Sequence, residues 1–173
     1  ESRPADIVGG DLFDYLPQSS RLMGVAVADA SGHGLPAALQ ARDIITGMRM
    51  GMQGDLKIIA AIERLNRVIN MSGLTSRFVS LFYCEIETNG NFIYCNAGHP
   101  PPLLLQGAAF RELTEGGLIL GPNPTAQYQR GFATMAPGDC VLMYTDGVTE
   151  GLGPSEKEYG VGRPAVREAL FHL

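Results

Sequence analysis

The sequence predicts an α+β fold in which antiparallel sheets and helices pack in layers. Two helical patterns follow one another early in the chain, and several strand-like runs fill the second half. An Asn-Gly dipeptide, the strongest short hairpin signal, joins two of these runs, and both of their faces are largely apolar. A sheet with two apolar faces must be covered on both sides, so we expect stacked layers.

The composition is that of one globular domain. The chain has 173 residues, 45% of them hydrophobic and 18% charged, and this length suits one core but is short for two. A net charge of −5 argues against binding to nucleic acid or to an anionic membrane, because such binding usually needs a basic patch. No apolar run is long enough to span a bilayer, and residues 1–10 lack a signal-peptide pattern. We therefore expect a soluble, cytoplasmic domain.

The first predicted elements are a strand and two helices. Residues 21–29, RLMGVAVAD, form a short apolar run with valines, which predicts a buried strand that ends in an acid. Pro36 suits the first turn of a helix, and a helical pattern continues to about Met52. A second helix is expected from Leu56 to Ser72, because apolar residues recur there at helical spacing and Gly73 follows.

Residues 78–87 and 91–97 form the predicted hairpin. If its loop is symmetric about Asn89-Gly90, the numbers of paired residues sum to about 179. This register predicts two groups of side chains, one on each face of the hairpin. They are Phe78, Phe82 and Ile86 with Ile93 and Ala97, and Val79, Leu81 and Tyr83 with Phe92 and Tyr94.

The three cysteines lie in apolar, strand-like runs and lack the spacing of metal ligands, so we expect buried, reduced thiols. The predicted register places Cys84 opposite Cys95. Cross-strand Cβ atoms lie about 4.5–5.5 Å apart, whereas a disulfide needs about 3.5–4.5 Å. We therefore predict adjacent free thiols at this pair.

The rest of the chain predicts short strands and a final helix. Pro137-Gly138-Asp139 is a turn that leads into the last strand, and residues 163–173 begin a helix. The strands are expected at residues 102–105, 110–113, 127–133 and 140–145.

Three aspartates occupy similar contexts: Asp11 in IVGGDLFD, Asp29 in VADASGHG and Asp146 in YTDGVTE. Each lies at the edge of an apolar run beside small residues, so a rigid element holds the acid while carbonyl groups and water can approach. Mg²⁺ and Mn²⁺ require such oxygen-rich, partly hydrated sites. Taken singly, each acid is more simply explained as a turn or helix-cap residue. Together they make a metal site a hypothesis.

Longer motifs resemble those of one family. GGDLFD, DASGHG followed by PAAL, RFVSLFYCEIE, YCNAGHPPPLLL and MYTDGVTE occur in the order typical of the SpoIIE/RsbU-type branch of the metal-dependent (PPM, type 2C) Ser/Thr protein phosphatases. The resemblance covers nearly the whole chain. It implies two packed antiparallel β-sheets flanked by helices, in one domain over residues 1–173. That domain would lack the family's first strand and its C-terminal metal-binding strand, because no aspartate follows Asp146.

The resemblance also implies a cofactor and its ligands. Two divalent cations, Mn²⁺ or Mg²⁺, would share Asp29 as a bridging ligand, with the backbone carbonyl of Ala30 as a further donor. Asp11 would hold one cation and Asp146 the other. The cations would activate a water for in-line attack on phosphorus.

We predict different roles for two histidines. His33 resembles a histidine that protonates the leaving alkoxide in the eukaryotic branch of the family, so it is a candidate catalytic residue; a role in structuring its loop is the alternative. His99 belongs to the NAGHPPP signature, and we expect it to be structural or to position the regulatory helices.

By resemblance, the substrate is phosphoserine or phosphothreonine on an anti-anti-sigma (STAS) protein, in bacterial sigma-factor or stress signalling. The two helices between residues 36 and 72 match switch helices through which a sensor domain, in the same or an associated chain, or a homodimer contact exerts control. We also expect low basal activity from the domain alone.

Two other functions remain open. A phosphatase-like module could bind a STAS partner without hydrolysing it, since the last expected aspartate is absent from the sequence. A divalent-metal phosphoesterase for small molecules would show no preference for a phosphoprotein.

Overall fold

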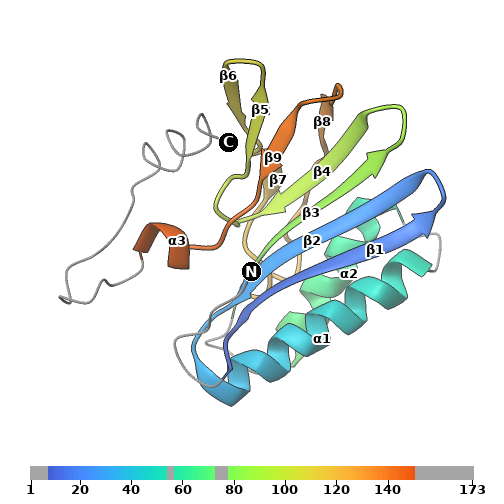
Figure 1. Ribbon diagram of the computed structural model, residues 1–173. Helices are drawn as coiled ribbons and strands as arrows, with labels where there is room; N and C mark the ends of the chain where they lie inside the picture. The colour runs from blue at the N-terminus through green and yellow to red at the C-terminus, as the bar shows by residue number, and fades with distance from the viewer. Residues whose placement is uncertain (1–7, 54–56, 73–77, 151–173) are drawn as a thin grey trace.

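The computed structural model describes residues 8–53, 57–72 and 78–150, and Figure 1 shows their layered arrangement. A large sheet has the strand order β1-β2-β3-β4-β7, and β8 also pairs with β4. Its strands are β1 (Asp11–Ser19), β2 (Leu22–Ala30), β3 (Val79–Glu87), β4 (Asn91–Ala97), β7 (Gly116–Gly117) and β8 (Gly131–Thr134). A small sheet has the order β6-β5-β9. Its strands are β5 (Leu103–Gln106), β6 (Ala109–Glu112) and β9 (Cys140–Leu142).

Two helices cover one face of the large sheet. α1 (Gly34–Gln53) lies against β1 and β2, and α2 (Ile58–Met71) lies beside α1 and reaches β4 (Figure 1). The apolar stripe of α2 that the sequence predicts faces this core, because Ile58, Ile62 and Leu65 are buried there. A short helix, α3 (Gly147–Glu150), follows β9.

The small sheet packs on the other face of the large sheet. Phe82 and Tyr94 of the large sheet share a buried cluster with Leu104 of β5, and Val141 of β9 packs against it. The prediction that both faces of the hairpin are covered is therefore confirmed, as is the α+β sandwich of two sheets with helices outside.

The register of the hairpin differs from the predicted one by one residue. Tyr83 pairs with Cys95, and Cys84 pairs with Tyr94, so the paired numbers sum to 178. The loop has three residues, 88–90, and the Gly90 N–H donates to the Glu87 carbonyl at 2.9 Å. Gly90 has a φ of +89°, the left-handed conformation expected at the end of such a loop. A two-residue loop was the wrong assumption.

This shift of one residue changes which side chains share a face, because side chains alternate between the faces of a strand. Val79, Leu81 and Tyr83 share the helix side with Cys95 and Ala97, whereas Phe82 and Cys84 share the other side with Phe92 and Tyr94. Cys84 and Cys95 are free and buried, as predicted, but they lie on opposite faces. Their predicted adjacency is wrong.

Cys140 also departs from its prediction, because this free thiol is exposed. It pairs with Leu105, next to the Leu104–Val141 pair whose side chains face the large sheet. The alternation of a strand therefore turns Cys140 away from that core.

Most predicted elements are present, with shifted ends. The predicted strand over residues 21–29 is β2, and α1 begins two residues before Pro36. The last predicted strands are shorter, since β8 begins at Gly131 and β9 ends at Leu142. The final helix predicted over residues 163–173 lies outside the described residues.

The sequence prediction missed β1. Its nine residues include Pro17 and two aspartates, which are rare in central strands. β1 is an edge strand, and its pairing with β2 shifts register between Pro17 and Ser19. An edge position tolerates a proline because only one side of the strand must form hydrogen bonds.

Within the described ranges, no helix is long and apolar enough to cross a membrane.

Candidate metal centre

Asp11 and Asp29 come together through the pairing of β1 with β2. They are direct partners in this antiparallel ladder, and such partners project from the same face of a sheet. On the other side of β2, Asp29 pairs with Ser80 of β3. Ser80 alternates with Leu81, which faces the helices, so these side chains lie on the face that the small sheet shares.

Asp146 reaches the same place from the far end of the chain. It follows β9 and directly precedes α3. The adjacent Thr145 hydroxyl donates a hydrogen bond of 2.8 Å to Asp11 Oδ2. The structure therefore brings together Asp11, Asp29 and Asp146, the aspartate row, although Asp146 is more than a hundred residues from the other two in the sequence.

The pKa of Asp29 reflects the nearby carboxylates. Burial, followed by the charges of Asp11 and Asp146 and a hydrogen bond with Asp11, raises the pKa of the Asp29 carboxyl from 3.8 to about 6. Three carboxylates that crowd one another disfavour ionisation of the most buried member. A dication between them would remove this repulsion.

The backbone leaves room beside Asp29. The Ala30 N–H donates to the Gly10 carbonyl at 3.2 Å. A Cβ atom at position 10 would lie 2.3 Å from the Ala30 oxygen and 3.2 Å from Asp29 Oδ1. Glycine therefore keeps open a space that a backbone carbonyl and a carboxylate both border, and hard oxygen donors of this kind suit Mg²⁺ or Mn²⁺.

The carboxylates do not yet form a closed ligand set. Among residues 8–53, 57–72 and 78–150, no three His, Cys, Asp or Glu side chains converge closely enough to hold an ion. The donor chemistry of these residues thus fits a divalent cation.

His33 lies in the loop between β2 and α1 and is exposed. This position, four residues after Asp29, is compatible with both of the roles that we expected. Its catalytic role stays a prediction.

His99 is buried at the centre of a polar network. Ser80 Oγ lies 2.8 Å from His99 Nδ1, and the His99 N–H donates to Asn96 Oδ1 at 2.8 Å. The Asn96 amide donates in turn to the carbonyls of His99 at 3.0 Å and Leu113 at 3.2 Å. This network adjoins the aspartate row through Ser80, which the sequence motif alone did not indicate.

Burial lowers the pKa of His99 from 6.5 to about 4, although the backbone of Tyr144 favours the protonated form. Nε2 makes no hydrogen bond of standard geometry with the described residues, yet the Tyr144 backbone is close enough to act on the ring. His99 is therefore a neutral imidazole between β3 and the segment that leads to Asp146.

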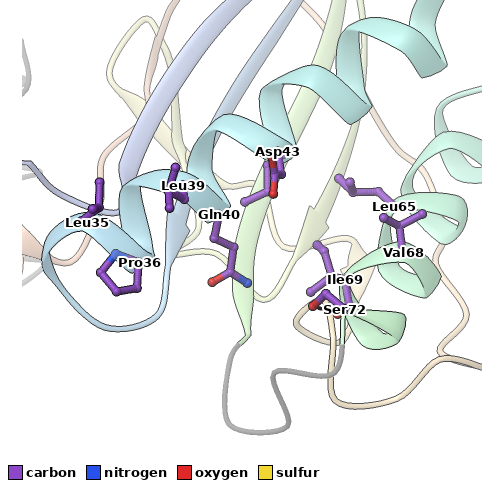
Figure 2. A pocket seen from close by; sticks show the side chains of 10 residues that line it. Leu35, Pro36, Leu39, Gln40, Asp43, Leu65, Val68, Ile69 and Ser72 are labelled. Carbon is purple, nitrogen blue, oxygen red and sulfur yellow. Dashed lines mark hydrogen bonds between the residues drawn. The ribbon is translucent and has the colours of Figure 1, made fainter.

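A second feature is an apolar groove between α1 and α2, with a volume of about 310 Å³. Figure 2 shows side chains of both helices facing it, including Leu39 and Gln40 from α1 and Val68 from α2. Leu39 and Val68 are exposed. Gln40 is buried, and its Oε1 has no partner among the described residues.

The fold and the aspartate row define a class of protein. The chain superposes on the SiaA-PP2C domain of Pseudomonas aeruginosa with a TM-score of 0.82 at 20% identity, over 96% of this chain and 67% of that one. It superposes on the RsbU and RsbW domains of Rv1364c from Mycobacterium tuberculosis with a TM-score of 0.76 at 28% identity, over 96% and 45%. The fold is that of PP2C phosphatase domains.

Residues 19–170 match the family described as Stage II sporulation protein E (SpoIIE), and the chain belongs to this family. It is 29% identical over 152 residues to the phosphoserine phosphatase RsbU of Bacillus subtilis (strain 168), covering 86% of this chain and 45% of RsbU. The chain spans less than half the length of the curated relatives that it matches.

One further solved structure shares the fold. RsbX, in complex with magnesium, superposes with a TM-score of 0.63 at 20% identity, over 97% of this chain and 81% of RsbX. At this identity the likeness shows the fold.

Proposed function

We propose that this domain hydrolyses phosphoserine or phosphothreonine on a partner protein with two divalent cations, Mn²⁺ or Mg²⁺. Asp29 would bridge the cations, Asp11 and Asp146 would each hold one, and the Ala30 carbonyl would add a ligand. The observation that carries the proposal is geometric: Asp11 pairs with Asp29 across β1 and β2, and Thr145, next to Asp146, bonds to Asp11 Oδ2. Membership of a family that includes a phosphoserine phosphatase supports it.

The bound cations would supply Lewis-acid activation of water and of the phosphoryl group. The chain's own residues have separate tasks. Burial, and then the charges of Asp11 and Asp146, raise the pKa of Asp29, and a bound cation would favour its charged, ligating form. Thr145 fixes the Asp11 carboxylate through its hydroxyl, and Gly10 keeps space open beside the Ala30 oxygen. His33 is the candidate acid for the leaving alkoxide.

The partner we propose is a phosphorylated STAS-type anti-anti-sigma protein, in the cytoplasm. RsbU is by name a phosphoserine phosphatase, and the solved relative from M. tuberculosis combines RsbU and RsbW domains. Control by a sensor domain, or by a homodimer contact, would act through α1 and α2. The exposed apolar groove between these helices supports this part of the proposal.

A second candidate function is a module that binds the STAS protein without hydrolysing it. The observation that favours it is the open arrangement of the acids, since no three ligand side chains converge within the described residues.

Manganese-dependent hydrolysis distinguishes these functions. We expect the domain to release phosphate from a phosphorylated STAS protein, and more slowly from p-nitrophenyl phosphate, only when Mn²⁺ is present. Asp29→Asn should abolish release. Asp139→Asn is the matched control, because it removes the same charge at the other end of β9, where Asp139 caps a turn through the Ala136 N–H.

Two other outcomes of this assay would each favour a different function. Binding of the phosphoprotein without phosphate release would favour the binding module. Equal rates on the phosphoprotein and on the small ester would instead indicate a phosphoesterase for small molecules.

A further inference from the structure

A continuous series of contacts links the aspartate row to His99. Along the large sheet, Asp11 pairs with Asp29 and Asp29 pairs with Ser80. These two steps are backbone ladders, so they fix the spacing of the three positions. Ser80 then contacts His99 Nδ1 through its hydroxyl at 2.8 Å.

The remaining contacts come from the segment that follows β9. The backbone of Tyr144 lies against the His99 ring, and Tyr144 is buried beside Leu103 of β5. The next residue, Thr145, donates to Asp11 Oδ2 at 2.8 Å. Asp146 follows directly, so the segment that carries it is held at Tyr144 by His99 and at Thr145 by Asp11.

The position of His99 is itself firmly held. The residue is 3% exposed, and its backbone N–H and C=O both bond to the Asn96 side chain. Asn96 is anchored again to the Leu113 carbonyl. The His99 side chain is tightly packed and its backbone is fixed, so it has no free rotamer. A displacement on one side of the imidazole would therefore move the group on its other side.

We propose that His99 is a positioning residue for the metal centre, which sets the place of Asp146 relative to Asp29 by joining Ser80 to the Tyr144 backbone. This inference rests on the proposed metal site of Asp11, Asp29 and Asp146. His99 itself donates nothing to a cation. It acts as the outer partners of metal ligands commonly do, and loss of such partners typically weakens metal binding about 10–100-fold.

The test measures Mn²⁺ binding to the full chain by electron paramagnetic resonance of the free ion, alongside the Tm of the metal-free protein. His99→Leu removes both polar contacts and keeps an apolar group of useful size. We expect its Kd for Mn²⁺ to rise on the order of 10–100-fold. His99→Asn, whose amide can still meet Ser80, should recover part of this loss, and Ser80→Ala should weaken binding in the same direction as His99→Leu.

Tyr83→Phe is the matched control. It removes a buried hydroxyl from the same strand, but on the opposite face, where Tyr83 bonds to Gln18 and Glu85. We expect a lower Tm with an unchanged Kd. If His99→Leu and Ser80→Ala likewise lower only the Tm, His99 is merely structural and the inference is wrong.

Should His99→Leu fail to fold, Ser80→Ala decides the question alone. A different result would overturn the proposed function itself: Mn²⁺ bound equally by the unsubstituted chain and by Asp29→Asn would mean that no metal site exists at these aspartates.

Discussion

Asp29 carries the raised pKa of the aspartate row. It is the innermost of three carboxyls that a cation would hold together, and without a cation it keeps its proton to about pH 6. Crowding of partly buried carboxyls destabilises the metal-free folded protein. Such crowding is common where a site functions by binding an ion.

Asp29→Asn should therefore stabilise the metal-free protein near pH 7. The folded state binds this proton up to about pH 6, whereas the unfolded chain releases it near 3.8. The folded state thus holds more protons between these values, and its stability falls as the pH rises through them. Because the carboxyl is only half-buried, solvent screening leaves an effect on the order of 1–2 kcal/mol.

Urea unfolding in EDTA at pH 4.5 and pH 7 measures this effect. The unsubstituted protein should lose stability across the interval, and Asp29→Asn should remove that loss, because an amide does not titrate. Asp139→Asn should not stabilise the protein, because the Ala136 N–H lowers the pKa of Asp139 and so favours its charge. Identical pH profiles for the unsubstituted protein and Asp29→Asn would contradict the prediction.

Gly10→Ala should disturb the same site from the backbone side. The new methyl group would lie 2.3 Å from the Ala30 oxygen, so β1 or β2 must shift. Overpacking of this kind costs about 1–3 kcal/mol, and we expect weaker Mn²⁺ binding as well.

Denaturant unfolding and Mn²⁺ titration check the effect at Gly10. Gly51→Ala in α1 is the control, because its methyl group meets only Ala61 Cβ at 3.4 Å and alanine favours a helix by about 1 kcal/mol over glycine. Unchanged stability and metal affinity in Gly10→Ala would show that the approach of Gly10 to Ala30 is not required.

At the scale of elements, the loop of the β3–β4 hairpin decides which residues face which layer. The three-residue loop at 88–90 ends on Gly90, whose φ is +89°. It also docks on the segment after β8, because the Met135 N–H donates to the Gly90 carbonyl at 2.8 Å. One loop thus sets the register of β3 with β4 and the approach of β8.

Gly90→Ala should be clearly more destabilising than Gly107→Ala. Both glycines have positive φ, at +89° and +59°, and a left-handed L-residue costs roughly 1–2 kcal/mol. A methyl group at Gly107 meets nothing within 4 Å, whereas one at Gly90 would lie 2.2 Å from the Met135 oxygen. We expect about 1 kcal/mol at Gly107 and roughly 3 kcal/mol at Gly90, by addition of an overpacking cost. Equal losses of unfolding free energy in urea would show that backbone strain alone matters.

For the whole molecule, the two packed faces of the large sheet protect different thiols. Cys84 lies in the core between the sheets and Cys95 in the core under the helices. Burial raises the pKa of the Cys84 thiol well above its ordinary range and that of Cys95 to about 12. Neither thiol can become a reactive thiolate while the layers stay together.

Thiol labelling of the native protein should therefore modify Cys140 alone, because it is the exposed cysteine. All three should react after unfolding in urea. Mass spectrometry of iodoacetamide-treated protein counts the labels, and Cys140→Ser should leave the native protein unlabelled. Rapid native labelling at Cys84 or Cys95 would mean that a layer opens without global unfolding.

Much of this protein is determined by local sequence pattern. The helical spacing of apolar residues predicts α1 and α2, and the apolar faces of residues 78–97 predict a sheet covered on both sides. Asp11, Asp29 and Asp146 stand out as candidate ligands because each lies beside small residues at the edge of an apolar run. These features depend on neighbours within a few positions, which a sequence displays directly.

Other features depend on contacts that only the folded chain makes. The hairpin register follows from a loop of three residues instead of two, and a shift of one residue reverses every face. β1 becomes a strand because β2 pairs with it, despite Pro17. The hydrogen bond of Thr145 with Asp11, and the placement of His99 between Ser80 and Tyr144, join segments far apart in the chain. No local pattern encodes such contacts, because they arise only when the two sheets pack against each other.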